Sequence, residues 1–258
     1  MEAAKPVSLT KPHWRSARWL SAIELLLGIA VVIGHNVYHI VPSEVIVLFV
    51  TGAISVRVRE GRFSAIGLRR PSSWPRIIAI AIVAAATRLL LGELVIDPWT
   101  ARFWPPAAAP SGTDSIAGNA AQALKWLAIV WTYAAFGEEF VYRGYLLTRT
   151  ADLGMRSALA YSIGLIVTSV LFGYGHYYKG PSGIIDSGAA GFIFGAAYLL
   201  SGRNLWAPIL AHGFVDTLGV GMLFLGLDSG ISLPVIIDMS NLQLKPREVA
   251  VLKLPGNC

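Results

Sequence analysis

Six ionisable side chains lie inside apolar stretches in the second half of the sequence, and their types could support hydrolysis. They are Glu138, Glu139, Arg143, His176, His212 and Asp216. If these stretches cross a membrane, each charge costs at least about 2.5–3.5 kcal/mol and normally faces a cavity or a partner. A carboxylate in such a cavity can act as a general base, and an imidazole can hold a water or an oxyanion. We therefore expect these side chains to meet in one site.

The spacing of the first three side chains suggests different roles for the two adjacent acids. Glu139 and Arg143 are four residues apart, so on a helix they share one face and can form an ion pair. Glu138 lies about 100° further round an α-helix. If Arg143 neutralises Glu139, then Glu138 is the acid without a local partner. We expect Glu138 to be the general base.

The composition indicates a helical membrane protein. The chain has 258 residues, of which 55% are hydrophobic and only 14% charged, and its mean hydropathy is +0.59. Apolar runs of about 20 residues are typical of transmembrane helices. The sequence predicts an all-α, polytopic transmembrane helical bundle with about seven to eight spans. The expected spans are 19–40, 43–56, 75–96, 120–147, 159–176, 184–201 and 204–227, with a short eighth element at 231–239.

The charge pattern predicts the orientation of the bundle. The loop 57–76 holds six arginines and one acid, which is typical of a cytoplasmic loop. The N-terminus is then cytoplasmic too, and we expect an integral protein of a prokaryotic cell membrane. The net charge of +6 comes from arginines beside apolar runs, so no nucleic-acid partner is expected. Membrane lipids are the expected surroundings.

The chain divides into three expected regions. Residues 1–119 form a three-span accessory region, 120–227 a catalytic core, and 228–258 a C-terminal tail or the short eighth element. In the core, Gly188, Gly191 and Gly195 predict a face for close helix packing. In the accessory region, Glu44 is interpreted as interfacial, and Glu24 has no assigned role.

Three motifs, in order, carry a resemblance to a known family. They read "EEFVYR" (138–143), "FGYGH" (172–176) and "HGFVD" (212–216). The pattern resembles that of the CAAX-protease and bacteriocin-processing family of intramembrane glutamic endopeptidases, also called the Abi family. The resemblance covers about residues 120–225. It implies an endopeptidase that cleaves a membrane-tethered protein or peptide, with or without a lipid group, near its C-terminus.

The resemblance also implies roles for the motif residues. Glu138 and His176 would hold and activate the attacking water, and His212 with Asp216 would stabilise the oxyanion. Glu139, Arg143 and Phe172 would support the site. Asparagine is common at the last position, where this chain has Asp216. An ionised aspartate would repel an oxyanion, so Asp216 must either be protonated or act by orienting His212 through a hydrogen bond, and we favour the second.

Three other functions remain open from the residues alone. One glutamate and two histidines could hold zinc in a metallopeptidase, although no His-Glu-x-x-His motif is present, and we expect no cofactor or metal. Intramembrane acids and histidines also serve proton relays in transporters. A non-catalytic immunity or scaffold protein could have kept the same fold.

Overall fold

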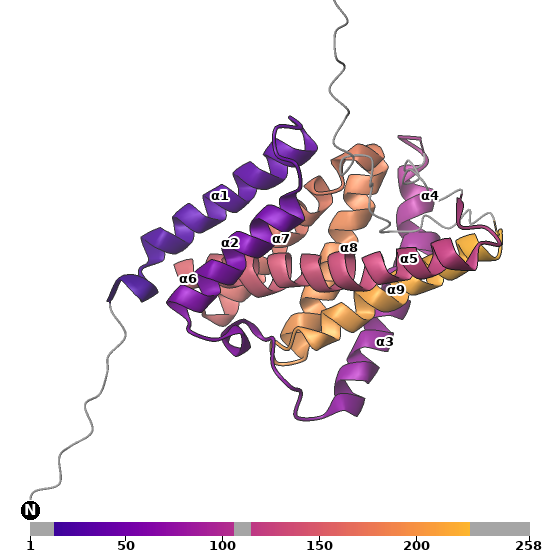
Figure 1. Cartoon of the computed structure of the whole chain (residues 1–258). Coiled ribbons are helices and arrows are strands. Elements are labelled where there is room, and N and C mark those ends of the chain that lie inside the picture. The colour runs from indigo at the N-terminus through magenta and orange to yellow at the C-terminus, as the bar shows by residue number, and fades with distance from the viewer. Residues whose placement is uncertain (1–12, 106–114, 228–258) are drawn as a thin grey trace, which may run out of the picture.

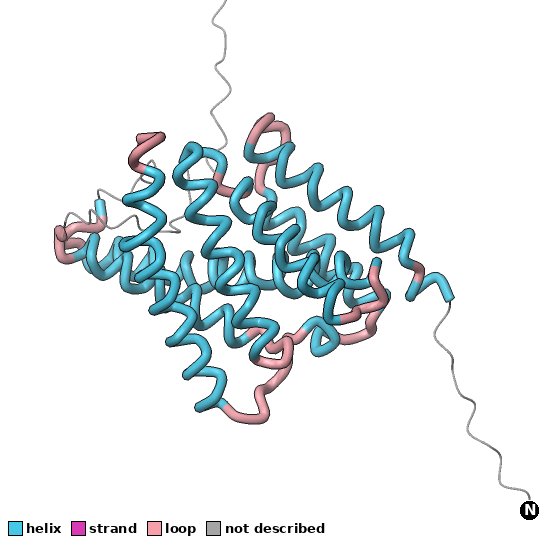
Figure 2. The backbone as a smooth tube through the Cα atoms, turned by 180° about the vertical axis from the view of Figure 1, so that it is seen from behind, coloured by secondary structure: helices cyan, strands magenta, loops and turns pink. Residues whose placement is uncertain are grey.

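The computed structural model describes residues 13–105 and 115–227. Within these residues it is a bundle of helices without strands, as expected (Figures 1 and 2). The first part contains η1 (His13–Ser16), α1 (Arg18–Asn36), α2 (Glu44–Arg59), η2 (Phe63–Ile66), α3 (Trp74–Leu91), the π-helix η3 (Gly92–Ile96) and α4 (Asp97–Thr100). The second part contains α5 (Ala120–Ile129), the π-helices η5 (Val130–Glu138) and η6 (Phe140–Leu146), α6 (Leu147–Leu153), α7 (Ala158–Tyr174), η7 (Tyr177–Lys179), α8 (Gly180–Leu200) and α9 (Trp206–Phe224). The predicted tail 228–258, with its short element at 231–239, lies outside the described residues.

Each of the seven expected spans coincides with a helical segment, but the number of spans is not confirmed. Four helical stretches are long and apolar enough to cross a membrane, namely Arg18–Asn36, Trp74–Thr100, Tyr177–Leu200 and Trp206–Phe224. Helix α7 is apolar but shorter. The distribution of side chains also fits a lipid environment. Large apolar residues such as Trp19, Leu90 and Leu159 are exposed, whereas Arg143 and Arg149 are buried. The protein is therefore an integral membrane protein.

Polar residues fix where several helices begin. The side chains of Ser43, Ser73 and Ser157 accept hydrogen bonds from backbone amides in the first turns of α2, α3 and α7. Asn119 does the same for α5. Such caps satisfy amides that have no partner within the helix. They stand next to the apolar runs, which explains why the expected ranges were nearly correct.

The elements α5, η5, η6 and α6 form one continuous rod that crosses the molecule (Figure 1). Every residue from 137 to 151 is buried. Helices α1 and α2 pack against the part of the rod that contains η6 and α6, whereas α9 packs against α5 and η5. The rod therefore carries the motif at 138–143 through the core of the bundle.

Helices α7 and α8 pack closely because α8 presents glycines to α7. A Cβ atom on Gly191 would lie 3.2 Å from the Cβ of Phe172, and one on Gly195 would collide with Leu165. Gly188 faces the Ser169 carbonyl. The predicted packing face of Gly188, Gly191 and Gly195 is therefore confirmed. It brings the backbone of α8 within reach of side chains from the rod.

Candidate active site

The ion pair expected within the first motif is formed. Nη1 of Arg143 donates to Oε1 of Glu139 at 2.8 Å, and neither side chain is accessible from outside. Nη2 of Arg143 donates to the Gly191 carbonyl of α8 at 2.9 Å. A buried guanidinium needs both a counter-charge and further acceptors. This one has them and links the rod to α8.

Glu139 also holds His212 of α9. Nδ1 of His212 lies 2.8 Å from Oε1 of Glu139, so the same oxygen accepts from Arg143 and from the imidazole. The ring stacks on Phe194, with centroids 5.0 Å apart and planes at 21°. His212 is fully buried. Its orientation is therefore set by a carboxylate and an aromatic ring that lie far away in the sequence.

The expected hydrogen bond between Asp216 and His212 is not formed. Nε2 of His212 and Oδ2 of Asp216 are 3.5 Å apart, and both atoms lack a hydrogen-bond partner among the described residues. Glu139 takes the orienting role instead. Because Nδ1 donates to Glu139, Nε2 of a neutral His212 is an acceptor that faces a second acceptor. The geometry favours a proton on Nε2 or on the Asp216 carboxyl group.

Phe172 joins the three motifs. Its ring centroid lies 4.9 Å from that of His176 and 6.2 Å from that of His212. The guanidinium carbon of Arg143 lies 4.5 Å above the same ring. Cation–π contact of this kind stabilises a desolvated charge. The fully buried Phe172 is thus the common wall between the rod, α7 and α9.

His176 stands just after α7, at the start of η7, where the chain turns. Its Nδ1 lies 2.9 Å from the Phe172 carbonyl, four residues earlier. A carbonyl only accepts, so Nδ1 carries the proton and Nε2 of the neutral ring keeps its lone pair. His176 is buried, with 6% of the residue's surface exposed. Nε2 is therefore the nitrogen available to bind a proton or a water.

Glu138 differs from Glu139 as the spacing suggested. Its Oε2 is buried and makes no hydrogen bond to any described residue. Its carboxylate interacts electrostatically with His212, Asp216 and Glu139, and His176 also lies within electrostatic range of His212. Buried polar atoms without partners are uncommon in native proteins. Here Glu138, Glu139 and His212 contribute one such atom each and Asp216 contributes two, all in one neighbourhood.

The rod around Glu138 is π-helical rather than α-helical. The two π-helices span Val130–Glu138 and Phe140–Leu146 and meet at Glu139. Bonds from residue i to i+5 are rare and often occur at functional sites. The assumed 100° between Glu138 and Glu139 was based on α-helical geometry, so it does not apply here. The i,i+4 ion pair forms nevertheless.

Glu44 is part of this neighbourhood, whereas the sequence placed it at the interface. It is buried, and it accepts hydrogen bonds from Tyr142 at 2.8 Å and from the Asn36 amide. It interacts electrostatically with Glu138. Gly175 makes room for it, since a Cβ there would lie 2.7 Å from Oε1 of Glu44. Its position after a turn concealed this contact, because only the tertiary fold brings α2 beside His176.

A second buried ion pair borders the site on the side of Asp216. Nη2 of Arg88 in α3 donates to Oδ2 of Asp186 in α8 at 2.5 Å. Lys179 is also buried and interacts electrostatically with Asp186 and Asp216. The spacing of these residues along the chain does not predict their contacts. Arg88 and Lys179 place positive charge near Asp216, and Asp186 offsets part of it.

The arrangement has the parts that amide hydrolysis requires. It offers a carboxylate with an unpaired oxygen, an imidazole with a free lone pair and a second imidazole that is held rigidly. In the described ranges, no three or more His, Cys, Asp or Glu side chains are placed to hold one metal ion.

Comparison with known protein families gives a match over the segment that carries these residues. No curated protein and no solved structure matches the chain significantly. Residues 120–218 match the family model described as type II CAAX prenyl endopeptidase Rce1-like, which confirms over this segment the resemblance that the three motifs predicted.

Proposed function

We propose that this protein is a glutamate-type intramembrane endopeptidase that cleaves a membrane-tethered protein or peptide near its C-terminus. The family match supports a membrane endopeptidase. The observation that carries the finer assignment is that buried Glu138 forms no ion pair with a described residue and leaves its Oε2 without a partner, whereas Oε1 of Glu139 is bonded to both Arg143 and His212. Two adjacent acids in such different surroundings are typical of a base and its support.

In the first step, Glu138 takes a proton from a water molecule while the water oxygen attacks the scissile carbonyl carbon. Nε2 of His176 accepts a hydrogen bond from the same water and orients it. A carbon–oxygen bond forms, and the carbonyl oxygen becomes an oxyanion. In the second step the carbon–nitrogen bond breaks, and Glu138 returns its proton to the leaving amine. Glu138 is thus unchanged after one turnover.

His212 stabilises the oxyanion when Nε2 carries a proton. Its Nδ1 bond to Glu139 keeps Nε2 directed away from that acid. Asp216 remains close to Nε2 without a formal hydrogen bond. Asp216 either donates a hydrogen bond to the oxyanion as a neutral acid or keeps His212 protonated. Both states provide a donor where negative charge develops.

Access from the lipid side supports a membrane-tethered substrate. An apolar groove of about 190 Å³ lies between α2 and η5 and is lined by residues that include Val45, Phe49, Tyr133 and Phe136. It also contacts Gly137, the residue before Glu138. A lipidated or apolar segment could therefore approach the base without leaving the membrane. We therefore propose that the substrate carries a lipid group.

We also propose a role for each region of the chain and an orientation in the membrane. Residues 120–227 would form the catalytic core, and the first three spans would be accessory, although Glu44 and Arg88 reach the site from them. The arginine-rich loop 57–76 supports a cytoplasmic N-terminus in a prokaryotic cell membrane. Reporter fusions at the N-terminus and in the loop 97–119 would test the orientation, which requires opposite sides for the two.

The test of function compares peptides released by membranes that contain the intact chain or Glu138→Gln. Mass spectrometry should detect C-terminal fragments with the intact chain and none with the variant. Glu93→Gln is the matched control, because Glu93 is also a membrane-segment acid but is not among these site residues. If Glu138→Gln releases the same fragments, or if the cellular role persists without release, the peptidase assignment is wrong.

A further inference from the structure

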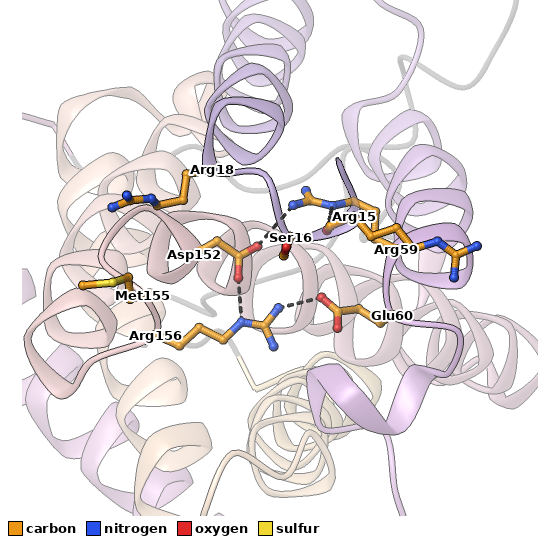
Figure 3. A pocket seen from close by; sticks show the side chains of 8 residues that line it. All are labelled: Arg15, Ser16, Arg18, Arg59, Glu60, Asp152, Met155 and Arg156. Carbon is orange, nitrogen blue, oxygen red and sulfur yellow. Dashed lines mark hydrogen bonds and ion pairs between the residues drawn. The ribbon is translucent and has the colours of Figure 1, made fainter. Parts of the chain in front are cut away.

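A pocket of about 400 Å³ lies at the end of the bundle where the start of α1, the end of α2 and the turn after α6 meet. Figure 3 shows that it is lined by charged side chains, which include Arg15, Arg18, Arg59, Glu60, Asp152 and Arg156. None of them belongs to the candidate catalytic cluster. Its volume lies in the range of small-ligand sites.

The acids of this region are already occupied. Glu24 pairs with Arg59 at 2.9 Å and with Arg149 at 2.7 Å. Glu60 and Asp152 both pair with Arg156 at 2.6 Å, through Nη2 and Nε respectively. Asp152 also pairs with Arg149 at 2.9 Å. Glu60 also pairs with Arg149 at 3.3 Å and Asp152 with Arg59 at 3.8 Å. Each carboxylate therefore serves at least two guanidinium groups, and none is left for a further cation.

Two arginines are in excess over this network. Arg15 and Arg18 line the pocket, but neither forms an ion pair with any described residue, and Nε of Arg15 is buried without a hydrogen-bond partner there. Counting both, five guanidiniums (Arg15, Arg18, Arg59, Arg149, Arg156) face three carboxylates (Glu24, Glu60, Asp152). The excess of two positive charges favours an anionic ligand. Guanidinium groups match phosphate oxygens particularly well.

An apolar groove of about 300 Å³ adjoins this pocket and shares Arg59 with it. Its apolar lining comes from α1 and α2 and includes Leu20, Leu27, Ile54 and Val58. Trp14, next to Arg15 in sequence, also lines it and is 45% exposed. Tryptophan is typical of the headgroup level of a membrane. A basic pocket thus continues into an apolar groove at a membrane edge.

We propose that this paired pocket and groove bind one anionic phospholipid, with the phosphate beside Arg15 and Arg18 and an acyl chain between α1 and α2. The charge excess selects an anionic group, and the groove selects a lipid rather than a free ion. Basic pockets between transmembrane helices bind lipid headgroups in this way. The site is independent of the proposed peptidase reaction.

The test measures lipid retention on the full-length protein in detergent by native mass spectrometry. The probes are dioleoyl phosphatidylglycerol and, as the neutral lipid, dioleoyl phosphatidylcholine. The double variant Arg15→Gln, Arg18→Gln should bind phosphatidylglycerol at least about tenfold more weakly, whereas its affinity for phosphatidylcholine should not change. The matched control Arg62→Gln, Arg70→Gln removes the same charge from exposed arginines in the segment between α2 and α3 and should change binding less than about twofold.

Two further arms separate the possible sources of phosphate. Inorganic phosphate at the same concentration as the lipid should not displace it. Ile54→Trp fills the groove and should weaken the binding of dioleoyl phosphatidylglycerol but not that of dihexanoyl phosphatidylglycerol. Equal effects of the two double variants would overturn the proposal, because only general surface charge would then matter. Displacement by inorganic phosphate with no effect of Ile54→Trp would also overturn it in favour of a simple anion site. Unchanged thermal unfolding of the variants ensures that the loss is not a folding defect.

Discussion

Oε1 of Glu139 accepts two hydrogen bonds of 2.8 Å, one from Nη1 of Arg143 and one from Nδ1 of His212. One oxygen atom therefore connects the first motif to the third. The positive charge of Arg143 stabilises the carboxylate, and the carboxylate in turn fixes the tautomer of the histidine. Substitutions at Glu139 should consequently affect folding and chemistry together, whereas substitutions at Glu138 should affect chemistry alone.

We expect Glu139→Leu to lower the free energy of unfolding by about 3–5 kcal/mol, because it leaves Arg143 buried without a counter-charge. The double variant Glu139→Leu, Arg143→Met removes both charges and should recover most of that loss. Both variants should be inactive, since His212 is no longer oriented. Thermal unfolding in detergent, analysed as a double-mutant cycle, measures the coupling. If the single and double variants are equally unstable, the loss of stability in Glu139→Leu does not come from the broken ion pair.

We expect Asp216→Asn to keep most of the activity, within about tenfold of the intact protein. Asp216 makes no hydrogen bond to His212, and Glu139 already orients that ring. An amide at this position can also donate to an oxyanion. The ratio kcat/KM for a released peptide is the measurement. Near-complete loss at normal protein level would mean that the acidic proton of Asp216 is essential.

Gly175→Ala should lower kcat by about a hundredfold with a smaller effect on unfolding. The new Cβ would lie 2.7 Å from Oε1 of Glu44 and 2.8 Å from the Tyr142 hydroxyl, so the turn that carries His176 must shift. Gly221→Ala is the matched control, because a Cβ on that helical glycine of α9 meets no atom within 4 Å. Similar activities of the two variants would argue against a role for the position of His176.

The stability of the arginine-rich end should depend on pH in one direction. Burial alone would raise the pKa of Glu60 and of Asp152, but the guanidiniums of Arg156 and Arg149 outweigh it and lower both. A lowered pKa contributes stability that is fully present above the unfolded value and is lost as pH falls through the folded value. The loss should therefore start below the ordinary values of 4.5 for Glu60 and 3.8 for Asp152.

Thermal unfolding of the full chain between about pH 7 and pH 3 measures this effect. The double variant Glu60→Gln, Asp152→Asn should be less stable at neutral pH and should lose less stability on acidification than the intact chain. Parallel pH profiles for the two proteins would contradict the assignment of the titrating groups.

Local periodicity was sufficient to predict the helices and the ion pair. Apolar runs located the helical segments, and the spacing of Glu139 and Arg143 predicted their contact. The same reasoning could not give the number of membrane crossings. Length and hydropathy single out four helical stretches, and the rod that contains the expected span 120–147 is not among them.

Contacts between distant segments could not be predicted from spacing. Glu139 and His212 are 73 residues apart, and Tyr142 and Glu44 are 98 apart. A single sequence contains no information that pairs them. For this reason Asp216 was assigned the role that Glu139 fills, and Glu44 was placed at the interface. The polar pocket around Arg59 was missed for the same reason, although it also explains Glu24, which had no assigned role.

The π-helical stretch has a consequence for protein engineering. Its wider turns set the angular offset between the beginning of the rod and the acids that follow. The number of residues in this stretch therefore matters more than which residues they are. Removing a single position between 131 and 136 would favour ordinary α-helical winding and would rotate everything upstream relative to Glu138. Chimaeras joined within this stretch must therefore conserve its length, even where their apolar side chains are freely exchanged.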